Sequence, residues 1–282
     1  MKPFFESIFN FEKEVSNMAI IALDGAKELG DKVDYYLTNW YNTEVKKSGK
    51  KIPEKKTFLL KNVCPRFTTG DGKGMINDTV RGKDLFILVD VGNYSLTYNM
   101  FGVDNRMSPD DHYADLKRII SAAGGKAKSM TVVMPSLYGG RQHRRNARES
   151  LDCSQMLHEL ETMGVSDVIT FDAHDPRVQN AVPLMGFDNF MPTYQILKAL
   201  LKAFPDVNMN KESFMIVSPD EGAMGRNVYY ASVLGTDLGM FYKRRDYSTI
   251  VNGRNPIVAH EYIGNDVRGK DIFVADDIIA TG

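Results

Sequence analysis

Short apolar runs alternate with helix-like segments along most of this chain, and this alternation constrains its fold more than any other feature. Each run is four or five residues long and apolar at nearly every position, which is typical of strands buried on both faces of a sheet. Strands that alternate with helices favour a mostly parallel α/β sheet, because parallel neighbours are joined by crossover connections. The runs are Thr57–Leu60, Leu85–Val89, Met130–Met134, Val168–Phe171, Phe214–Val217, Gly239–Tyr242 and Ile272–Ala275.

The beginning of the chain has a different pattern. Apolar residues, among them Val15 and Met18, recur at helical spacing over residues 4–45. A lysine-rich stretch with a proline follows over residues 46–56. We therefore expect residues 1–56 to form an N-terminal helical extension and linker.

The length of 282 residues favours two domains of ordinary size. An amphipathic helix and a polar turn between Pro192 and Lys211 are suited to a domain boundary. We expect one domain over residues 57–195 and a second, incomplete one over residues 196–282, because the chain stops inside its last motif.

The composition excludes several classes of protein. Apolar residues make up 43% of the chain and the formal net charge is −1, so no general basic field favours nucleic acid or an anionic membrane. Acidic residues interrupt the apolar N-terminus, which therefore lacks the pattern of a secretory signal, and no segment approaches a membrane span. Cys64 and Cys153 form no C-x-x-C pair, which fits a reducing cytoplasm. We expect a cytoplasmic protein with no nucleic-acid or membrane partner.

The last nine residues place two adjacent carboxylates directly after an apolar strand. Asp276 and Asp277 follow this strand, and a turn of small residues, Ala280-Thr281-Gly282, comes shortly after. Paired acids can accept hydrogen bonds from vicinal hydroxyls, while small residues let backbone N–H groups approach a phosphate. This order predicts a sugar-phosphate site, and a chain that ends at Gly282 should bind the phosphate poorly.

Two other strands end in polar loops. The run that ends at Phe171 leads into Asp172-Ala173-His174-Asp175, whose carboxylates and imidazole could hold a divalent cation or a phosphate-bound water. A loop histidine with a capping aspartate is the alternative. The run that ends at Val217 leads into a segment with Asp220, several glycines and Arg226. That segment suits a ligand loop or a plain turn before a helix.

Cationic residues follow two further strands. Four arginines lie close together from Arg141 to Arg148, next to glycines, and guanidinium groups pair bidentately with phosphate oxygens. A solvated basic loop or an RNA-binding patch is the alternative, and the overall charge disfavours RNA. Lys243-Arg244-Arg245 continue the strand that begins at Gly239 and would face solvent or an anion.

Taken in chain order, these segments resemble the ribose-phosphate diphosphokinase (ribose-phosphate pyrophosphokinase, phosphoribosyl diphosphate synthetase) family over about residues 57–282. No single motif is decisive, but their order is specific. The matching motifs are Arg66-Phe67, Val80-Arg81-Gly82-Lys83-Asp84, Arg141-Gln142, Arg148-Glu149, Asp172-x-His174, Ser218-Pro219-Asp220, Lys243-Arg244-Arg245, Gly269-Lys270 and Asp276-Asp277 with Thr281-Gly282.

The resemblance implies two phosphoribosyltransferase-like domains, each a mostly parallel sheet flanked by helices. It implies an enzyme that transfers the diphosphoryl group of Mg-ATP to ribose 5-phosphate, giving phosphoribosyl diphosphate and AMP, with Mg²⁺ as cofactor. It also implies a homo-oligomer built from dimers, up to a hexamer.

The resemblance further assigns roles to individual residues. Lys243, Arg245 and His174 would be catalytic. The ATP-binding residues would be Phe67, Asp71, Arg141, Gln142 and His174. The ribose 5-phosphate-binding residues would be Asp220, Asp276, Asp277, Thr281 and Gly282, and the metal would be held by His174 and Asp220.

The chain departs from the family pattern at several positions. Thr69 replaces the first acid of F-x-D-G-E and Asp71 shortens the second, His143 replaces the aspartate of R-Q-D, and Ala280 replaces an acid of the last loop. These departures leave two alternatives open. One is a non-catalytic regulatory paralogue, and the other is a type I phosphoribosyltransferase, which shares the last loop but should lack the earlier motifs.

Overall fold

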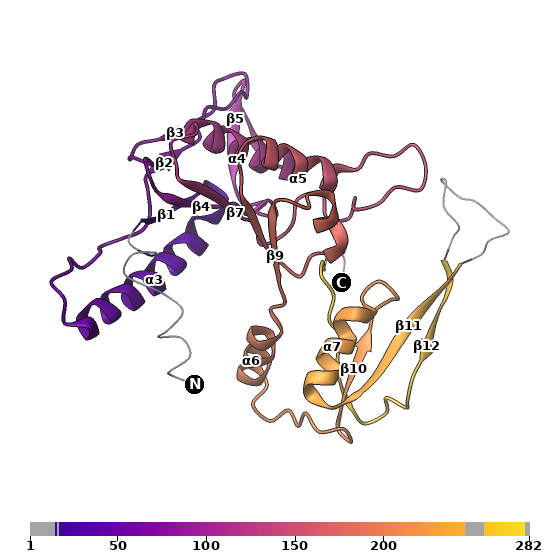
Figure 1. Cartoon of the computed structure of the whole chain (residues 1–282). Helices are drawn as coiled ribbons and strands as arrows, with labels where there is room; N and C mark the ends of the chain where they lie inside the picture. Colours follow the sequence, from indigo (N-terminus) through magenta and orange to yellow (C-terminus); the bar gives the residue numbers. More distant parts are fainter. Residues whose placement is uncertain (1–14, 16, 246–256, 280–282) are drawn as a thin grey trace. The chain divides into compact units, whose positions relative to one another are not determined.

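The computed structural model describes residue 15 and residues 17–245 and 257–279. The chain divides into two compact units, Met1–Met191 and Pro192–Gly282 (Figure 1). The division lies four residues before the boundary that the sequence suggested. Each unit contains its own sheet.

The first unit is built on a five-stranded parallel sheet in the order β1-β4-β7-β8-β9. This order places each crossover helix against the sheet and brings the carboxyl ends of all five strands to one edge. The strands are β1 (Met18–Ala22), β4 (Asp84–Leu88), β7 (Ser129–Val133), β8 (Asp167–Phe171) and β9 (Gly186–Phe190).

Helices cover both faces of this sheet. Successive strand residues enter opposite clusters, as Leu88 of β4 packs with α3 (Lys27–Ser48) while Ile87 packs with α4 (Pro109–Ala123) and α5 (Asp152–Thr162). The expectation of strands buried on both faces is therefore confirmed. Two short 3-10 turns, Asp24–Ala26 and Pro176–Ala181, precede α3 and β9.

The beginning of α4 shows how the sequence sets a helix end. Ser108 and Asp111 form a reciprocal capping box, and Pro109 occupies the first helical position, where its missing N–H is not needed. Gly124 ends the helix in the left-handed conformation, with φ of 52°.

The helix expected over residues 4–45 is wrong over residues 18–22, which form β1. It is confirmed over residues 27–45, which lie in α3, while residues 4–14 and 16 lie outside the described residues. Strand β1 pairs in parallel with β4 and is apolar toward both faces, so burial in the sheet overrides its helical spacing. Helix α3 approaches β1 so closely that a Cβ on Gly30 would lie 2.5 Å from the Ala22 Cβ. Residues 18–48 thus belong to the first unit.

The run Thr57–Leu60 also differs from its expected form. It forms no named strand, but Ile20 N–H donates to the Phe58 carbonyl and Leu60 N–H to the Ile20 carbonyl, both at 2.8 Å. The run therefore extends the sheet beyond β1 by a single bridge.

Two small hairpins complete the first unit. One joins β2 (Asn62–Val63) to β3 (Met75–Ile76), and the other joins β5 (Thr97–Met100) to β6 (Val103–Arg106).

The second unit has a four-stranded sheet in the order β12-β11-β10-β13. Strand β10 is parallel to β11 and β13, while β12 is antiparallel to β11. The elements are α6 (Thr193–Ala203), β10 (Phe214–Ser218), α7 (Met224–Leu234), β11 (Asp237–Arg245), β12 (Ile257–Ile263) and β13 (Asp271–Phe273). Its core gathers Phe214, Ile216, Tyr230, Ala231 and Ala275.

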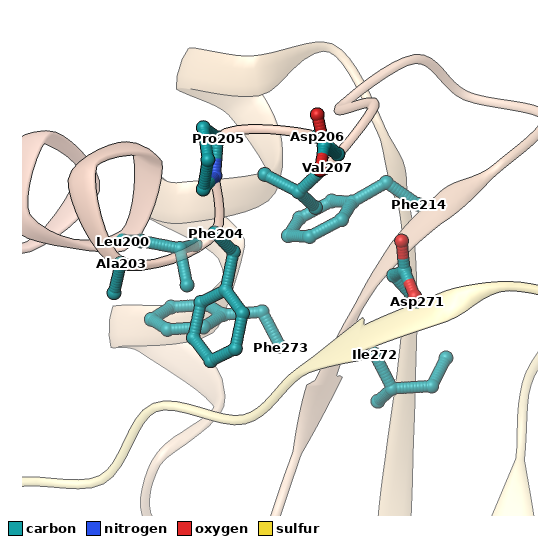
Figure 2. Close-up of a pocket in the computed structure, with 10 residues that line it drawn as sticks. All are labelled: Leu200, Ala203, Phe204, Pro205, Asp206, Val207, Phe214, Asp271, Ile272 and Phe273. Carbon is teal, nitrogen blue, oxygen red and sulfur yellow. The ribbon is translucent and has the colours of Figure 1, made fainter.

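A cavity of about 510 Å³ opens at the amino ends of β10 and β13 (Figure 2). Phe204, Phe214 and Phe273 line it with other apolar residues, and Asp206 and Asp271 are its charged members. The family motifs follow the carboxyl ends of these strands, so the cavity lies at the opposite edge of the sheet from the motifs.

No helix among the residues that the structure describes is long and apolar enough to cross a membrane.

Candidate active site

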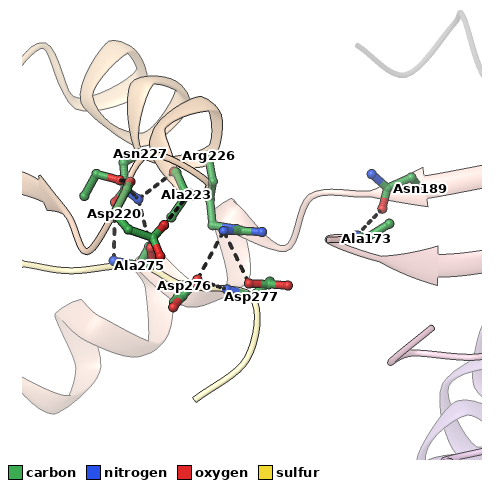
Figure 3. A network of polar contacts seen from close by, with 10 residues as sticks. Ala173, Asn189, Asp220, Ala223, Arg226, Asn227, Ala275, Asp276 and Asp277 are labelled. Atoms are coloured by element: carbon green, nitrogen blue, oxygen red, sulfur yellow. Dashed lines mark hydrogen bonds and ion pairs between the residues drawn. The ribbon is translucent and has the colours of Figure 1, made fainter. Parts of the chain in front are cut away.

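Two polar loops meet at one edge of the second sheet. Strands β10 and β13 are parallel neighbours, so the loop after Ser218 and the pair Asp276-Asp277 leave the sheet at the same end (Figure 3). Asn227, from α7, is fully buried and joins the two loops. Its Nδ2 donates to the Ala275 carbonyl at 2.8 Å and its Oδ1 accepts from the Ala275 N–H at 3.3 Å.

The same side chain reaches the loop after β10. Asn227 Nδ2 lies 3.3 Å from Ser218 Oγ, which itself donates to the Asp220 carbonyl at 2.7 Å. Asp220 Oδ1 accepts from the Ala223 N–H at 3.0 Å, immediately before α7. Asp220 therefore shapes the turn that leads into the helix, as the second sequence-based interpretation expected, and its role in a ligand loop stays a prediction.

Arg226 faces the paired acids. Its Nη1 lies 3.7 Å from Asp276 Oδ1 and 3.9 Å from Asp277 Oδ1, and the side chains of Arg226 and Asp277 are only 8% and 10% exposed. Partial burial raises the pKa of Asp276, and the hydrogen bond and negative charge of Asp277 with the charge of Asp220 raise it further. The structure thus brings three predicted ligand carboxylates, Asp220, Asp276 and Asp277, into one electrostatic cluster.

In the first unit, the loops after β7 and β8 meet through two histidines. The His143 and His174 rings lie 5.2 Å apart between centroids. His143 Nε2 is 3.5 Å from Asp175 Oδ2, while its buried Nδ1 has no hydrogen-bond partner among the described residues. Because β7 and β8 are parallel neighbours, segments more than thirty residues apart in the chain come together here.

The backbone around His174 is held from the neighbouring strand. Asn189 Oδ1, on β9, accepts from the Ala173 N–H at 2.9 Å (Figure 3). Asp172 adopts a positive φ of 47°, a conformation that aspartate tolerates better than most residues. Hydrogen bonds from Arg177 hold the pKa of Asp175 well below its usual value against the opposing effect of burial, with a smaller contribution from His143.

The predicted nucleotide loop is ordered by its own hydrogen bonds. Gln142 N–H donates to the Gly139 carbonyl at 2.7 Å, and Gln142 Nε2 donates to the Ser150 carbonyl at 3.0 Å. Arg141, by contrast, is exposed. The Gln142 side chain thus has a structural partner, and its ATP-binding role stays a prediction.

Phe67 and Asp71 lie on the loop between β2 and β3. Phe67 N–H donates to the Asp71 carbonyl at 2.8 Å, and Thr69 Oγ1 donates to Asp71 Oδ2 at 2.8 Å. Both Phe67 and Asp71 are exposed, and they form a group of their own within the first unit.

Lys243 and Arg245 lie on β11, whose antiparallel pairing with β12 sets Lys243 opposite His260. The strand is longer than the predicted Gly239–Tyr242 because this pairing continues beyond the end of β10. Thr281 and Gly282 lie outside the described residues.

Sequence reasoning missed two residues that hold the site, Asn227 and Asn189. Asn227 follows Met224 and precedes Tyr230 at three-residue spacing on α7. A lone amide on the buried face of a helix is a usable signal, because such a group needs hydrogen-bond partners. Asn189 lies on the unpredicted strand β9, so its contact could not be anticipated. Among the described residues, no group of three or more His, Cys, Asp or Glu side chains is placed to hold a metal ion.

Comparisons with known proteins agree with this architecture. A solved phosphoribosylpyrophosphate synthetase from Mycobacterium smegmatis is similar with a TM-score of 0.68 and 19% identity, over 93% of this chain and 71% of that one. The fold is therefore the two-domain phosphoribosyltransferase-like fold.

Sequence comparison is more specific. The model for the N-terminal domain of ribose phosphate pyrophosphokinase matches residues 18–164, about half of the chain. The chain belongs to the ribose-phosphate pyrophosphokinase family. The match begins at β1, which agrees with the place of residues 18–48 in the first unit.

Several curated relatives carry the family's name. The ribose-phosphate pyrophosphokinase of Ralstonia nicotianae is 28% identical over 228 residues, 79% of this chain and 63% of that protein. The one of Clostridium acetobutylicum is 29% identical over 220 residues, 77% of this chain and 60% of that protein. The chain thus spans about 60% of the length of the curated relatives that it matches.

Proposed function

We propose that the protein is a ribose-phosphate diphosphokinase, which transfers the β,γ-diphosphoryl group of Mg-ATP to the anomeric hydroxyl of ribose 5-phosphate. The products are phosphoribosyl diphosphate and AMP. The observation that carries the proposal is the cluster of Asp220, Asp276 and Asp277 beside Arg226, at the sheet edge where the family motifs fall.

The paired acids suit a ribose. Asp276 and Asp277 are adjacent, and the positive charge of Arg226 lies near both carboxylates. Two neighbouring carboxylates match two neighbouring hydroxyls, from which their oxygens accept hydrogen bonds. Thr281 and Gly282 begin the cradle of the 5-phosphate, where backbone N–H groups are the natural donors.

The nucleotide is assigned to the first unit. His174 and Arg141 bind the phosphates. Both are exposed and lie on loops that follow strands of the parallel sheet, and ligands bind at the carboxyl ends of such strands. Phe67 offers an exposed ring for the base, and Asp71 and Gln142 supply polar contacts. Lys243 and Arg245 neutralise the charge that develops on the transferring group.

The acidic cluster fits a magnesium ion only in part. Mg²⁺ favours carboxylate oxygens and is commonly bound through one or two of them together with substrate phosphates and waters. Asp220 and His174 are the proposed metal-binding residues. The bound ion would neutralise charge on the transferring phosphates.

We also propose that the protein acts in the cytoplasm as a dimer-based homo-oligomer. The two cysteines and the family resemblance support this proposal.

The test is AMP formation by the purified full-length protein. AMP should appear from ATP only when both ribose 5-phosphate and Mg²⁺ are present, measured by chromatography across a range of pH and phosphate concentration. Absence of AMP under all these conditions would contradict the enzyme proposal. His143 and Thr69, which stand where the family pattern has acids, would then favour the regulatory paralogue.

A type I phosphoribosyltransferase would not form AMP from ATP in this test. It would instead consume phosphoribosyl diphosphate in the presence of a nucleobase. The family match over residues 18–164 disfavours this alternative.

A further inference from the structure

A buried ion pair lies directly beneath the loop that carries Phe67 and Asp71. Arg66 Nη1 donates to Asp115 Oδ1 at 2.6 Å and Arg66 Nη2 donates to Asp115 Oδ2 at 2.9 Å, so the pair is bidentate. The two side chains are only 8% and 7% exposed. Asp115 belongs to α4, a helix packed on the main sheet, so the ion pair connects a surface loop to the rigid core of the unit.

The environment of Arg66 favours its charge. Burial alone would lower the pKa of this guanidinium, but the hydrogen bonds and charge of Asp115, with a contribution from Asp111, raise it. Arg118 Nη1 shares Asp115 Oδ1 at 2.7 Å, and the Tyr98 ring lies 5.2 Å from the Arg66 guanidinium carbon. Asp115 is therefore the acid that compensates two arginines.

Two glycines allow the loop to lie against this cluster. A Cβ on Gly72 would come within 2.5 Å of Arg118 Nη1 and 2.6 Å of Arg66 Nη1. A Cβ on Gly74 would lie 2.7 Å from the backbone of Arg118. At Gly74 the neighbour is backbone, so this position needs glycine. At Gly72 the neighbours are the ends of the Arg118 and Arg66 side chains, so a side chain there would have to displace these guanidinium groups.

The position of Arg66 also sets the direction of Phe67. Arg66 forms an antiparallel bridge with Gly72, and in extended backbone neighbouring side chains point to opposite faces. Arg66 points inward to Asp115, and Phe67 is 59% exposed on the other side. The Phe101 N–H donates to the Thr68 carbonyl at 3.0 Å, which fastens the outer end of the loop to the second hairpin.

We propose that Arg66 and Asp115 are positioning residues that hold Phe67 and Asp71 in the orientation required for nucleotide binding; the nucleotide part of this inference rests on the proposed function. Folding of the protein already orders the loop, so nucleotide binding does not have to provide the free energy for this step. The nucleotide meets the Phe67 ring and the Asp71 carboxylate in a preformed arrangement. The pair touches no substrate and acts through its neighbours.

The test places a reporter at position 67. Trp40 is the single tryptophan of the chain, so the double variant Trp40→Phe, Phe67→Trp carries one fluorophore, on the loop. Asp115→Asn is introduced into this background. Glu159→Gln is the control: Glu159, on α5, pairs at 3.0 Å with Lys117 on α4 and accepts a hydrogen bond from Tyr113, and neither contact involves the loop residues.

The first measurement is fluorescence anisotropy without any nucleotide. Asp115→Asn should lower the anisotropy of the tryptophan at position 67, and Glu159→Gln should leave it unchanged. Equal anisotropy in all three proteins would overturn the positioning role. This measurement does not depend on the proposed activity.

The second measurement is a titration with Mg-ATP, followed by quenching of the same tryptophan. Asp115→Asn should raise the dissociation constant by about tenfold or more, since small displacements of positioned groups have effects of this size, and Glu159→Gln should not. Unchanged affinity in Asp115→Asn would refute the inference while leaving the proposed function intact. No binding by any of these proteins, nor by the unsubstituted protein in a calorimetric titration with Mg-ATP, would refute the proposed nucleotide site itself.

A conservative variant protects the test against misfolding. If Asp115→Asn loses its near-ultraviolet circular dichroism, Arg66→Lys replaces it, because lysine keeps the charge but loses the bidentate fork. Arg66→Lys should give intermediate anisotropy and affinity, and parent-like values for both would overturn the inference.

Discussion

Asn227 bonds Ala275 through both ends of its side-chain amide, at 2.8 Å to the carbonyl and 3.3 Å from the N–H. The two residues lie 48 positions apart in the chain. Ala275 directly precedes Asp276, so this contact fixes where the paired acids leave β13. A residue with no predicted chemistry thereby determines the geometry of the proposed ribose site.

Replacing Asn227 should loosen this edge of the second unit. In Asn227→Ala the buried Ala275 N–H and carbonyl lose their partner, which costs about 1–3 kcal/mol for each unsatisfied group. Amide hydrogen exchange in β10 and β13 should accelerate accordingly. Asn208→Ala is the control, because Asn208 is exposed and its Oδ1 accepts a single bond, from the Asn210 N–H. Equal protection in the two variants would contradict the role given to Asn227.

The raised pKa of Asp276 predicts a pH dependence of ribose 5-phosphate binding. Burial first, and then Asp277 and Asp220, raise this pKa, so Asp276 takes up a proton at higher pH than an ordinary aspartate. Protonation removes the charge and turns one oxygen into a donor, so Asp276 then accepts hydrogen bonds from hydroxyls more weakly. Affinity should therefore fall as pH decreases, and the fall should begin at a higher pH than for an aspartate with the ordinary pKa of about 3.9. A carboxyl group whose pKa is raised by folding stabilises the folded state most at pH values below its pKa in the unfolded chain. This contribution to the free energy of unfolding is lost as the pH rises through the pKa of the folded state. The weakening at low pH is therefore not unfolding caused by Asp276.

Isothermal titration calorimetry can isolate this effect. The phosphate of the ligand also titrates, with a pKa of about 6, so the parent is compared with Asp276→Asn at each pH. The variant should bind more weakly and show a flatter pH profile that retains only the contribution of the ligand. Identical profiles would refute the assignment of Asp276 to the ribose hydroxyls.

The sequence predicted the parallel sheets because their strands are continuous apolar runs, such as Leu85–Val89 and Met130–Met134. It failed at β1, whose five residues also fit the helical spacing of their surroundings, and at β9, where Asp188 and Asn189 interrupt the apolar pattern. Periodicity describes a segment alone, and only pairing with a neighbour decides between the two structures.

The site was predictable to the extent that its residues follow strands. Asp220 and Asp276 could be expected at one edge, because the carboxyl ends of parallel strands coincide. Contacts between distant segments were not predictable: Arg66 meets Asp115 across 49 positions, and His143 meets His174 only because β7 and β8 are adjacent. These pairings depend on strand order, which local sequence does not determine.

Both cysteines should resist alkylation in the folded protein. Burial raises the pKa of Cys64 to about 12, with the charges of Asp115 and Asp24 adding to it, and burial raises that of Cys153 to about 11. Since the thiolate is the reactive form, modification by iodoacetamide at about pH 8 should be slowed at least about 100-fold relative to the protein in guanidinium chloride. Mass spectrometry of timed samples measures both rates. Rapid labelling of folded Cys64 would show that the loop above Asp115 opens readily.

Replacing Lys243 tests the assignment of catalysis to β11. If Lys243 stabilises charge that develops only in the transition state, Lys243→Ala should lower kcat by two to three orders of magnitude, equivalent to about 3–4 kcal/mol. The KM values for ATP and ribose 5-phosphate should change little, because a residue that acts only in the transition state does not contribute to binding of the substrates in the ground state. Lys202→Ala is the matched control, since Lys202 lies exposed on α6, away from the motif. Steady-state rates of AMP formation measure both parameters, and a raised KM with an unchanged kcat would assign Lys243 to ground-state binding instead.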